Sequence, residues 1–442
     1  MGAIVALAVA GCGGSAAAPP AAPHAKRVAV VDHATPPAPA PAPPAPAPQP
    51  PAAAPLSPAL SALQLALTRQ LGRAGAATGA YVFDLTNGRV LFALRDGVRR
   101  PPASVEKLYT SIAVLRELGA GVTLQTAVLG AGFLGNHGIW HGDLYVRGGG
   151  DPTFGDAAFN RNWEQGYGPT AAQLVTQLQH LGIRRVTGKV IGDAALFDGR
   201  RGVPSSGFAP DVPDLGGQLA ALTYDHGATA GRSPGAFAAN ELVLTMRASG
   251  IKASSLRRTL PAPPGARVLA TVTSPPASVL LRLMNVPSDD FFAEMLTKQL
   301  GARVGGAGTT AAGAGAIESV AAGYGIHPAI VDGSGLSRSD LSSPAEVVAL
   351  LRAVWRSPDG SVLWDSLPTV GVSGTVRTVG THTPARGRCV AKTGTLDNVS
   401  NLAGYCHARG HDVLAFALFV DGPSNWSAFK LISKMVGAIA AY

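Results

Sequence analysis

The sequence predicts an α/β (α+β) fold in which one domain, contributed by both ends of the chain, is interrupted by a β-rich insertion of one or two smaller domains. Helix-like and strand-like patterns fill residues 57–119 and return at 274–442, whereas residues 120–273 hold short β-rich runs and many glycines. A chain of 442 residues is also longer than one typical domain. We therefore expect a discontinuous domain around an inserted one.

Residues 1–12 have features of a lipoprotein leader. Met1 to Ala10 is short and apolar, and Val9-Ala10-Gly11-Cys12 resembles a bacterial lipobox, whose cysteine is lipidated and becomes the new amino terminus. No Lys or Arg precedes the apolar run, so either the natural start lies upstream of Met1 or the segment is not a signal. The first interpretation, which we favour, predicts an exported protein of the cell envelope, in the periplasm or on the outer face of a membrane, anchored through a lipid on Cys12.

Residues 13–56 are rich in Ala and Pro and predict an extended tether.

The sequence argues against several classes of partner and cofactor. The net charge is +9, but Lys and Arg are scattered, so we predict no nucleic-acid partner. Residues 130–135 match a dinucleotide fingerprint but are followed by a strand-like segment where a helix is needed. His137 and His141 lack further ligands, so we predict no metal and no other cofactor.

The outer domain opens with a helix, a hairpin and a second helix. The first helix starts at Ser57-Pro58 and ends at Gly72, and the second runs from Ser104 to near Gly119. Between them lie two strands joined by Asn87-Gly88, a strong hairpin turn. We expect these strands at 79–85 and 89–94, later ones at 388–395, 399–407 and 413–420, and further helices at 278–283, 289–300, 344–355 and 426–442. Within the insertion we expect a helix at 172–181 and strands at 144–146 and 185–191.

Two cysteines flank the predicted turn at Asp397-Asn398. Cys389 and Cys406 are equidistant from that turn, so a hairpin there would place them opposite each other on neighbouring strands. A disulfide and two free thiols both remain open, because not every cross-strand pair has suitable geometry.

Ser104 and Lys107 are a candidate nucleophile and base. If Ser104 opens a helix, Lys107 lies one turn away on the same face, where its ammonium nitrogen reaches the serine hydroxyl. A lysine that is partly desolvated can lose its proton and activate such a hydroxyl. The spacing alone is weak, because Ser427-Ala428-Phe429-Lys430 repeats it, and serine is also favoured at a helix start for structural reasons.

Lys392-Thr393-Gly394-Thr395, on a predicted strand, is more specific. The glycine would let a ligand backbone approach the strand, the threonine hydroxyls can bond a carboxylate, and the lysine adds positive charge. Ser-x-x-Lys, a serine-containing middle element and Lys-Thr-Gly form the set of β-lactamases and penicillin-binding proteins. Ser104 precedes Lys392, as that order requires, whereas Ser427 follows it.

The middle element is Asp332-Gly333-Ser334-Gly335-Leu336-Ser337-Arg338, and with it the chain resembles a known family from about Ser57 onward. This is the class C low-molecular-mass penicillin-binding proteins, the D-alanyl-D-alanine carboxypeptidase/endopeptidase family S13. Other matching stretches are Gly149 to Thr153, Gly192-Asp193, Phe197-Asp198, Ser288-Asp289, Ala293 to Leu296, Leu367-Pro368, Gly371, Gly374-Thr375 and Leu402 to Tyr405. The resemblance implies a transpeptidase-like domain with an antiparallel sheet flanked by helices.

The resemblance also implies a mechanism on D-alanyl peptides of peptidoglycan. Ser104 would attack the carbonyl with Lys107 as base, and Ser337 would relay a proton to the leaving amine. The terminal carboxylate would be held by Lys392 with Thr393, Gly394 and Thr395, and the N–H groups of Ser104 and Thr395 would form the oxyanion hole. β-Lactams would acylate Ser104 and leave slowly.

The sequence departs from the family pattern near Ser337. Ser339 stands where the Ser-x-Asn motif has its asparagine and would replace some of that residue's hydrogen bonds with substrate. We expect Asp340 to place a negative charge near the substrate carboxylate, and Asp290 also stands where asparagine is frequent. A D-Ala-D-Ala carboxypeptidase with endopeptidase activity is the leading hypothesis. One alternative is a catalytically weak or inactive peptidoglycan-binding member of the family. Another is a β-lactamase, although the long insertion argues against it.

Overall fold

The computed structural model describes residues 57–210, 213–228 and 230–442. The predictions made for residues 1–56, including the lipidation of Cys12, lie outside the described residues.

Strands from both ends of the chain form one antiparallel sheet in the order β2-β1-β10-β9-β8. Its strands are β1 (Thr78–Asp84), β2 (Arg89–Leu94), β8 (Cys389–Leu396), β9 (Val399–His407) and β10 (Val413–Asp421). Strand β1 pairs with β10 along its whole length, from Thr78 opposite Val420 to Asp84 opposite Leu414. The predicted α/β fold with an antiparallel sheet is therefore confirmed.

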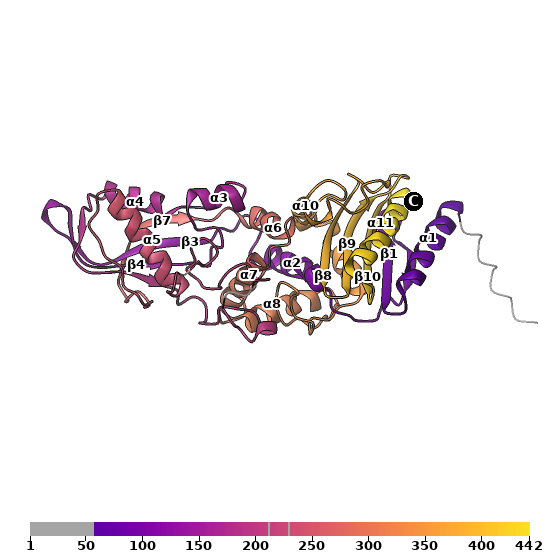
Figure 1. Cartoon of the computed structure of the whole chain (residues 1–442), viewed down its shortest axis with the longest axis horizontal. Helices are drawn as coiled ribbons and strands as arrows, with labels where there is room; N and C mark the ends of the chain where they lie inside the picture. The colour runs from indigo at the N-terminus through magenta and orange to yellow at the C-terminus, as the bar shows by residue number, and fades with distance from the viewer. Residues whose placement is uncertain (1–56, 211–212, 229) are drawn as a thin grey trace, which may run out of the picture. The chain divides into compact units, whose positions relative to one another are not determined.

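Helices cover both faces of this sheet (Figure 1). On one face α1 (Pro58–Ala74) and α11 (Asn425–Ala441) pack against each other. The opposite face carries α2 (Lys107–Glu117), α6 (Ala277–Asn285), α7 (Asp290–Arg303), α8 (Thr310–Ala322), α9 (Pro344–Trp355) and α10 (Pro358–Ser366). Strand β10 serves both cores, because Phe416 and Leu418 enter the α1/α11 core while Ala417 and Phe419 enter the other.

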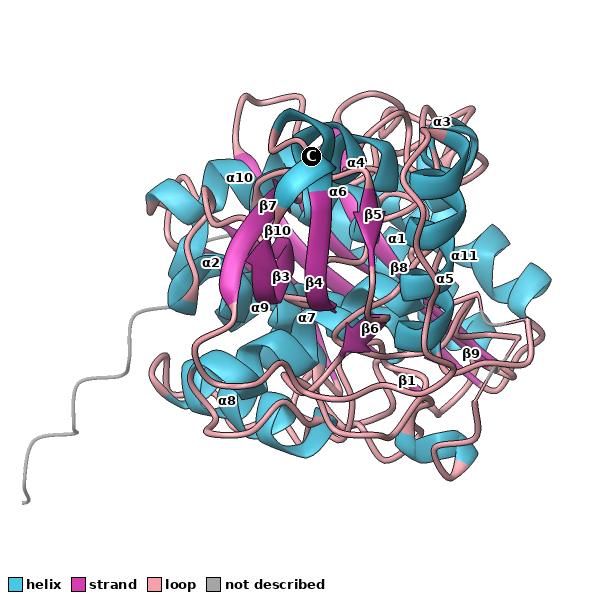
Figure 2. Ribbon diagram, turned by 90° about the vertical axis from the view of Figure 1, so that its left-hand side faces the viewer, coloured by secondary structure: helices cyan, strands magenta, loops and turns pink. Residues whose placement is uncertain are grey.

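The residues between the two halves form a second sheet in the order β5-β4-β3-β7, with β6 parallel to β4 (Figure 2). Its strands are β3 (Gln125–Leu134), β4 (Ile139–Arg147), β5 (Arg185–Val186), β6 (Val190–Asp193) and β7 (Arg267–Thr273). The accompanying helices are α3 (Ala157–Trp163), α4 (Ala171–His180) and α5 (Pro234–Ala248). Strands β3 and β7, at the two ends of this segment, pair with each other, so the segment begins and ends in neighbouring strands.

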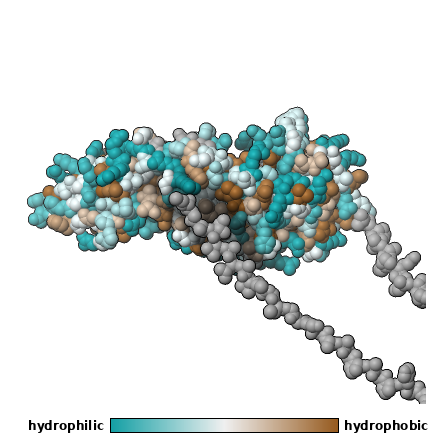
Figure 3. Space-filling view, turned by 90° about the horizontal axis from the view of Figure 1, so that it is seen from below, coloured by the Kyte–Doolittle hydropathy of each residue, from teal (hydrophilic) through white to brown (hydrophobic). Residues whose placement is uncertain are grey.

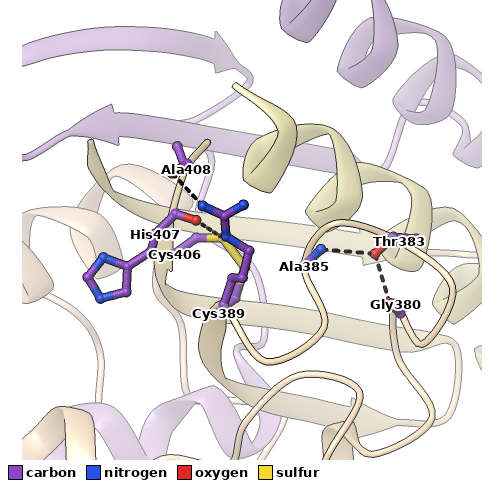
Figure 4. The surroundings of a disulfide bond; sticks show 8 residues. Gly380, Thr383, Ala385, Cys389, Cys406, His407 and Ala408 are labelled. Carbon is purple, nitrogen blue, oxygen red and sulfur yellow. Dashed lines mark hydrogen bonds between the residues drawn. A yellow bond between two sulfur atoms is a disulfide. The ribbon is translucent and has the colours of Figure 1, made fainter. Parts of the chain in front are cut away.

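Cys389 and Cys406 are opposite each other in the β8–β9 hairpin and form a disulfide (Figure 4). Beside it, the His407 backbone N–H donates to the Arg388 carbonyl, and the Arg388 guanidinium donates to the carbonyl of Ala408. Of the two alternatives left by the sequence, the structure therefore contains the bonded pair.

Hydrophilic and hydrophobic residues are interspersed on the face of the molecule seen in Figure 3. Among the described residues, no helix combines the length and apolar character needed to cross a membrane.

Candidate active site

Ser104 lies in a 3₁₀ turn, Ala103–Glu106, that leads directly into α2. The sequence placed Ser104 at the start of the α-helix, but regular α-helix begins three residues later, at Lys107. The turn is 3₁₀ because the Val105 N–H donates to the Pro102 carbonyl, an i to i+3 hydrogen bond. Ser104 is half-buried while its neighbours Ala103 and Val105 are buried, so the turn presents the serine hydroxyl.

The Lys107 ammonium is fully buried and donates to three acceptors from three parts of the chain. Its Nζ lies 3.0 Å from Ser104 Oγ, 2.8 Å from the Ser334 carbonyl and 2.5 Å from Asp290 Oδ1. These contacts use all three of its protons. The geometry places a lysine within hydrogen-bond reach of the serine, as nucleophile activation requires.

Ser337 belongs to a loop that Asp332 organises. The Asp332 carboxylate accepts the N–H groups of Gly335 at 2.7 Å and of Ser337 at 2.9 Å. Within residues 57–442 as far as the structure describes them, Ser337 Oγ makes no hydrogen bond to Ser104 or Lys107. The loop contacts the candidate base instead, because the Ser334 carbonyl accepts a hydrogen bond from Lys107.

The two residues after Arg338 point in different directions. Ser339 is exposed, and its backbone N–H donates to Ser337 Oγ at 3.1 Å. Asp340 is buried, and its Oδ1 accepts the Val331 N–H at 2.6 Å. Burial, together with the nearby Asp332 carboxylate, raises the pKa of Asp340 to about 9. The expectation of an Asp340 charge near the substrate carboxylate is therefore wrong, because this group is turned inward and neutral at pH 7.

Lys392 lies on β8 and is also fully buried. Its Nζ donates to Ser288 Oγ at 2.7 Å and to the Thr393 carbonyl at 3.0 Å. Burial, and then the positive charge of Lys107, lower the pKa of Lys392 well below its usual range. Thr393 Oγ1 donates to Thr375 Oγ1 at 2.8 Å. An anion that entered here would find the Lys392 amino group and the threonine hydroxyl groups already positioned, and its negative charge would favour the protonated form of Lys392.

Gly394 has a different role from the one that the sequence indicated. A Cβ at this position would lie 2.2 Å from the Pro102 carbonyl oxygen and 3.0 Å from the Val105 nitrogen. The protein's own 3₁₀ turn occupies that space, so the missing side chain lets the nucleophile turn lie against β8.

Of the predicted site residues, Ser104, Thr393 and Thr395 line one cavity of about 620 Å³, whereas Lys107, Ser337, Ser339, Lys392 and Gly394 are not part of its lining. It is lined by Ser104, Ser288, Asp290, Thr375, Thr378, Val379, Thr393, Thr395, Asn425, Trp426, Phe429, Lys430 and Ser433. The structure thus brings the predicted Ser104, Thr393 and Thr395 together. Ser288, Thr375 and the α11 residues received no role from the sequence, although Ser288-Asp289 and Gly374-Thr375 were among the family-like stretches.

An antiparallel five-stranded sheet with a Ser–Lys pair before a buried helix and a Lys-Thr-Gly-Thr edge strand beside it defines the active-site-serine, penicillin-binding class. The model of the D-Ala-D-Ala carboxypeptidase 3 (S13) family matches residues 62–229 and 214–442. The chain belongs to this family, and the resemblance in its motifs is confirmed.

Individual relatives agree with this assignment. The D-alanyl-D-alanine carboxypeptidase of Actinomadura sp. (strain R39) is 28% identical, over 83% of this chain and 82% of its own length. Carboxypeptidase DacB of Mycolicibacterium smegmatis is also 28% identical, over 91% of this chain and 90% of its own. Penicillin binding protein 4 of Haemophilus influenzae shares the fold, with a TM-score of 0.72 at 19% identity, over 85% of this chain and 99% of its own.

Proposed function

We propose that this protein is a serine-type D-Ala-D-Ala carboxypeptidase of the cell envelope that works through an acyl-enzyme and is inhibited by β-lactams. The observation that carries the proposal is the 3.0 Å contact between Lys107 Nζ and Ser104 Oγ, beside the Lys392 and Thr393 anion site and at the wall of the same cavity. Membership in the S13 family supports the same activity.

In the proposed acylation step, Lys107 acts in its neutral amine form, after it has given up one proton, and accepts the Ser104 hydroxyl proton as Oγ attacks the carbonyl before the terminal D-alanine. The N–H groups of Ser104 and Thr395 stabilise the oxyanion. The C–N bond breaks, Ser337 relays a proton to the leaving amine, and D-alanine departs. Lys392, Thr393 and Thr395 hold the terminal carboxylate during this step, and water then releases the acyl group. In the same proposal Ser339, which is exposed and bonds Ser337 Oγ through its backbone N–H, contributes a hydrogen bond to the substrate.

The test is labelling by a fluorescent penicillin, combined with D-alanine release from a pentapeptide ending in D-Ala-D-Ala. The wild type should be labelled and should release D-alanine, and Ser104→Ala should do neither. Ser427→Ala is the matched control, because Ser427 belongs to the other Ser-x-x-Lys sequence and does not line the cavity. Labelling that survives Ser104→Ala would refute the nucleophile. Labelling without D-alanine release would support the inactive, peptidoglycan-binding alternative.

The proposal extends to the anchor. A lipid on Cys12, followed by the Ala/Pro-rich residues 13–56, would attach the catalytic unit to a membrane beside its peptidoglycan substrate. Cys12→Ala should move the protein from the membrane fraction to the soluble fraction of the producing cells. Unchanged membrane association would contradict the anchor without affecting the catalytic assignment.

A further inference from the structure

The second sheet ends in a hairpin turn far from the catalytic residues. Strand β3 begins directly after Leu124, which is buried in the core that also contains α2 and α7. The strand has ten residues. At about 3.3 Å per residue it carries the chain roughly 30 Å away from that core. The Gly135 N–H then donates to the Ile139 carbonyl at 2.8 Å and closes the turn into β4 (Figure 1). The proposed acylation uses no group at this turn.

Two large apolar side chains are exposed beside the turn. Phe133 is 61% exposed and Leu134 is 43% exposed. Phe133 is opposite His141 in the β3–β4 ladder, and Leu134 is opposite Trp140. Because neighbouring residues of a strand point to opposite faces, one apolar side chain projects from each face of the hairpin.

The segment after α4 adds a third apolar side chain and two arginines. Leu181 is 45% exposed. The Arg184 N–H donates to the Gly138 carbonyl at 2.7 Å, and Arg185 pairs with Ile139 where β5 joins β4. Both arginine side chains are exposed. The two positive charges therefore lie next to the apolar turn.

The segment after α5 brings two more cations to the same place. The Lys252 N–H donates to the Arg184 carbonyl at 2.9 Å. Arg247 is held beside it, because its guanidinium donates to the Ala253 carbonyl at 2.8 Å. Both side chains are exposed. Within the part of the chain that the structure describes, none of the four cations forms an ion pair.

These positive charges have no carboxylate among the segments that meet at the turn. Residues 131–142, 177–189 and 245–254 contain no Asp and no Glu. Lys and Arg are scattered along the sequence, but the fold collects four of them here, where they would attract an anionic partner. We call this surface the distal tip, and its members are Phe133, Leu134, Leu181, Arg184, Arg185, Arg247 and Lys252.

The mixture of apolar and cationic side chains distinguishes between anionic partners. A polyanion without hydrocarbon would pair the cations but would leave Leu134 and Leu181 in water. An anionic phospholipid surface offers phosphates to the cations and acyl chains to the apolar groups. Both kinds of side chain at the distal tip are satisfied only by the lipid surface.

We propose that the distal tip binds the surface of an anionic phospholipid membrane. Its apolar side chains enter the boundary between headgroups and acyl chains, and its cations contact the headgroup phosphates. This contact requires neither acylation by Ser104 nor a lipid on Cys12. It would give the protein a membrane contact of its own at the end of the second sheet.

The experiment is vesicle sedimentation with the full chain carrying Cys12→Ala, so that no lipid anchor contributes. This parent protein should bind vesicles of phosphatidylglycerol and phosphatidylcholine, should bind pure phosphatidylcholine vesicles much less, and should lose binding as salt rises. Arg184→Gln with Arg185→Gln should weaken binding about 25-fold, since each cation near the surface contributes about fivefold. Phe133→Ser with Leu134→Ser should weaken it at least about tenfold.

Matched controls separate the tip from the rest of the second sheet. Arg257→Gln with Arg258→Gln removes the same charge from two exposed residues beside β6, because the Leu256 N–H donates to the carbonyl of Val190. Val190 pairs with Leu144, five residues along β4 from the turn at Ile139, or roughly 16 Å. Trp163→Ser removes an exposed aromatic side chain from α3. Neither control should weaken binding more than about twofold.

Three results would overturn the proposal: no binding of the parent to anionic vesicles, equal losses in the tip and control arginine pairs, or unchanged binding after Phe133→Ser with Leu134→Ser. The last result would indicate a purely electrostatic site for a polyanion. Penicillin labelling at Ser104 should be the same in all these variants, which checks that each is folded. Because that labelling is measured separately, failure of membrane binding leaves the carboxypeptidase proposal unaffected.

Discussion

Asp290 is the residue whose role changes most between sequence and structure. From the sequence, Asp290 is recognisable only as an aspartate at a position where family members often have asparagine. In the structure its Oδ1 lies 2.5 Å from Lys107 Nζ, so a carboxylate forms an ion pair with the proposed general base. Lys107 must lose one of its protons before it can accept the serine proton. The neutral amine that results no longer forms an ion pair with Asp290.

We expect Asp290→Asn to raise the penicillin acylation rate near neutral pH by about tenfold, since a hydrogen bond to a charged group contributes on the order of 1.5–3 kcal/mol. The asparagine oxygen can still accept from Lys107, so the site should keep its geometry. Stopped-flow acylation across a pH series measures the effect. A fall in rate at every pH would contradict this view and would indicate that Asp290 itself receives the proton from Lys107.

At the scale of elements, the active site depends on the close approach of the 3₁₀ turn to β8. The turn follows Pro101-Pro102, and Gly394 leaves the space into which it packs. A similar packing contact explains a helix that the sequence did not predict. Helix α8 contains two glycines, which disfavour helix, but a Cβ at Gly313 would lie 1.9 Å from the Thr297 carbonyl oxygen of α7. Tertiary packing therefore outweighs propensity there.

Gly394→Ala should lower the penicillin acylation rate by about a hundredfold, because its Cβ would push the turn and Ser104 away from β8. Gly315→Ala is the control, a helical glycine whose added Cβ would meet nothing within 4 Å. Acylation kinetics and thermal unfolding should be measured on both variants. An acylation rate of Gly394→Ala equal to wild type would show that the close approach is not needed.

At the scale of the whole molecule, several carboxyl groups are buried behind the site. Glu106, Glu294 and Asp340 are all buried, and desolvation, reinforced by neighbouring carboxylates, raises the pKa of each. The pKa of Glu294 rises to about 8 and that of Asp340 to about 9. Folded protein therefore holds protons that the unfolded chain loses near pH 4. This stabilising contribution is complete below that pH and is lost as the pH rises to about 9.

We expect the free energy of unfolding to fall between about pH 5 and pH 9, and Asp340→Asn to reduce that fall. In this variant the amide oxygen can still accept the Val331 N–H, and the substitution removes one titrating carboxyl group. At pH 9 the variant should be more stable than wild type by at least about 1 kcal/mol, the equivalent of roughly one pKa unit. Urea unfolding at several pH values provides the measurement, with exposed Asp214→Asn as control. A parallel pH dependence of wild type and Asp340→Asn would contradict the argument.

The sequence by itself determined the order of the motifs and most of the elements around them. Ser104, Ser337 and Lys392 occur in family order, and turn signals such as Asn87-Gly88 and Asp397-Asn398 are local, so no tertiary information is needed to find them. Helix α5 was missed although Ser233-Pro234 is a recognisable start.

Only the tertiary structure decided which side chains meet. Asp290 and Ser334 reach Lys107 from distant parts of the chain, Asp340 turns inward, and α11 brings Trp426 and Lys430 to the cavity of Ser104. Each of these contacts depends on how helices pack on the sheet. Packing is fixed by complementary shapes across the whole fold, and a local sequence pattern carries little of that information.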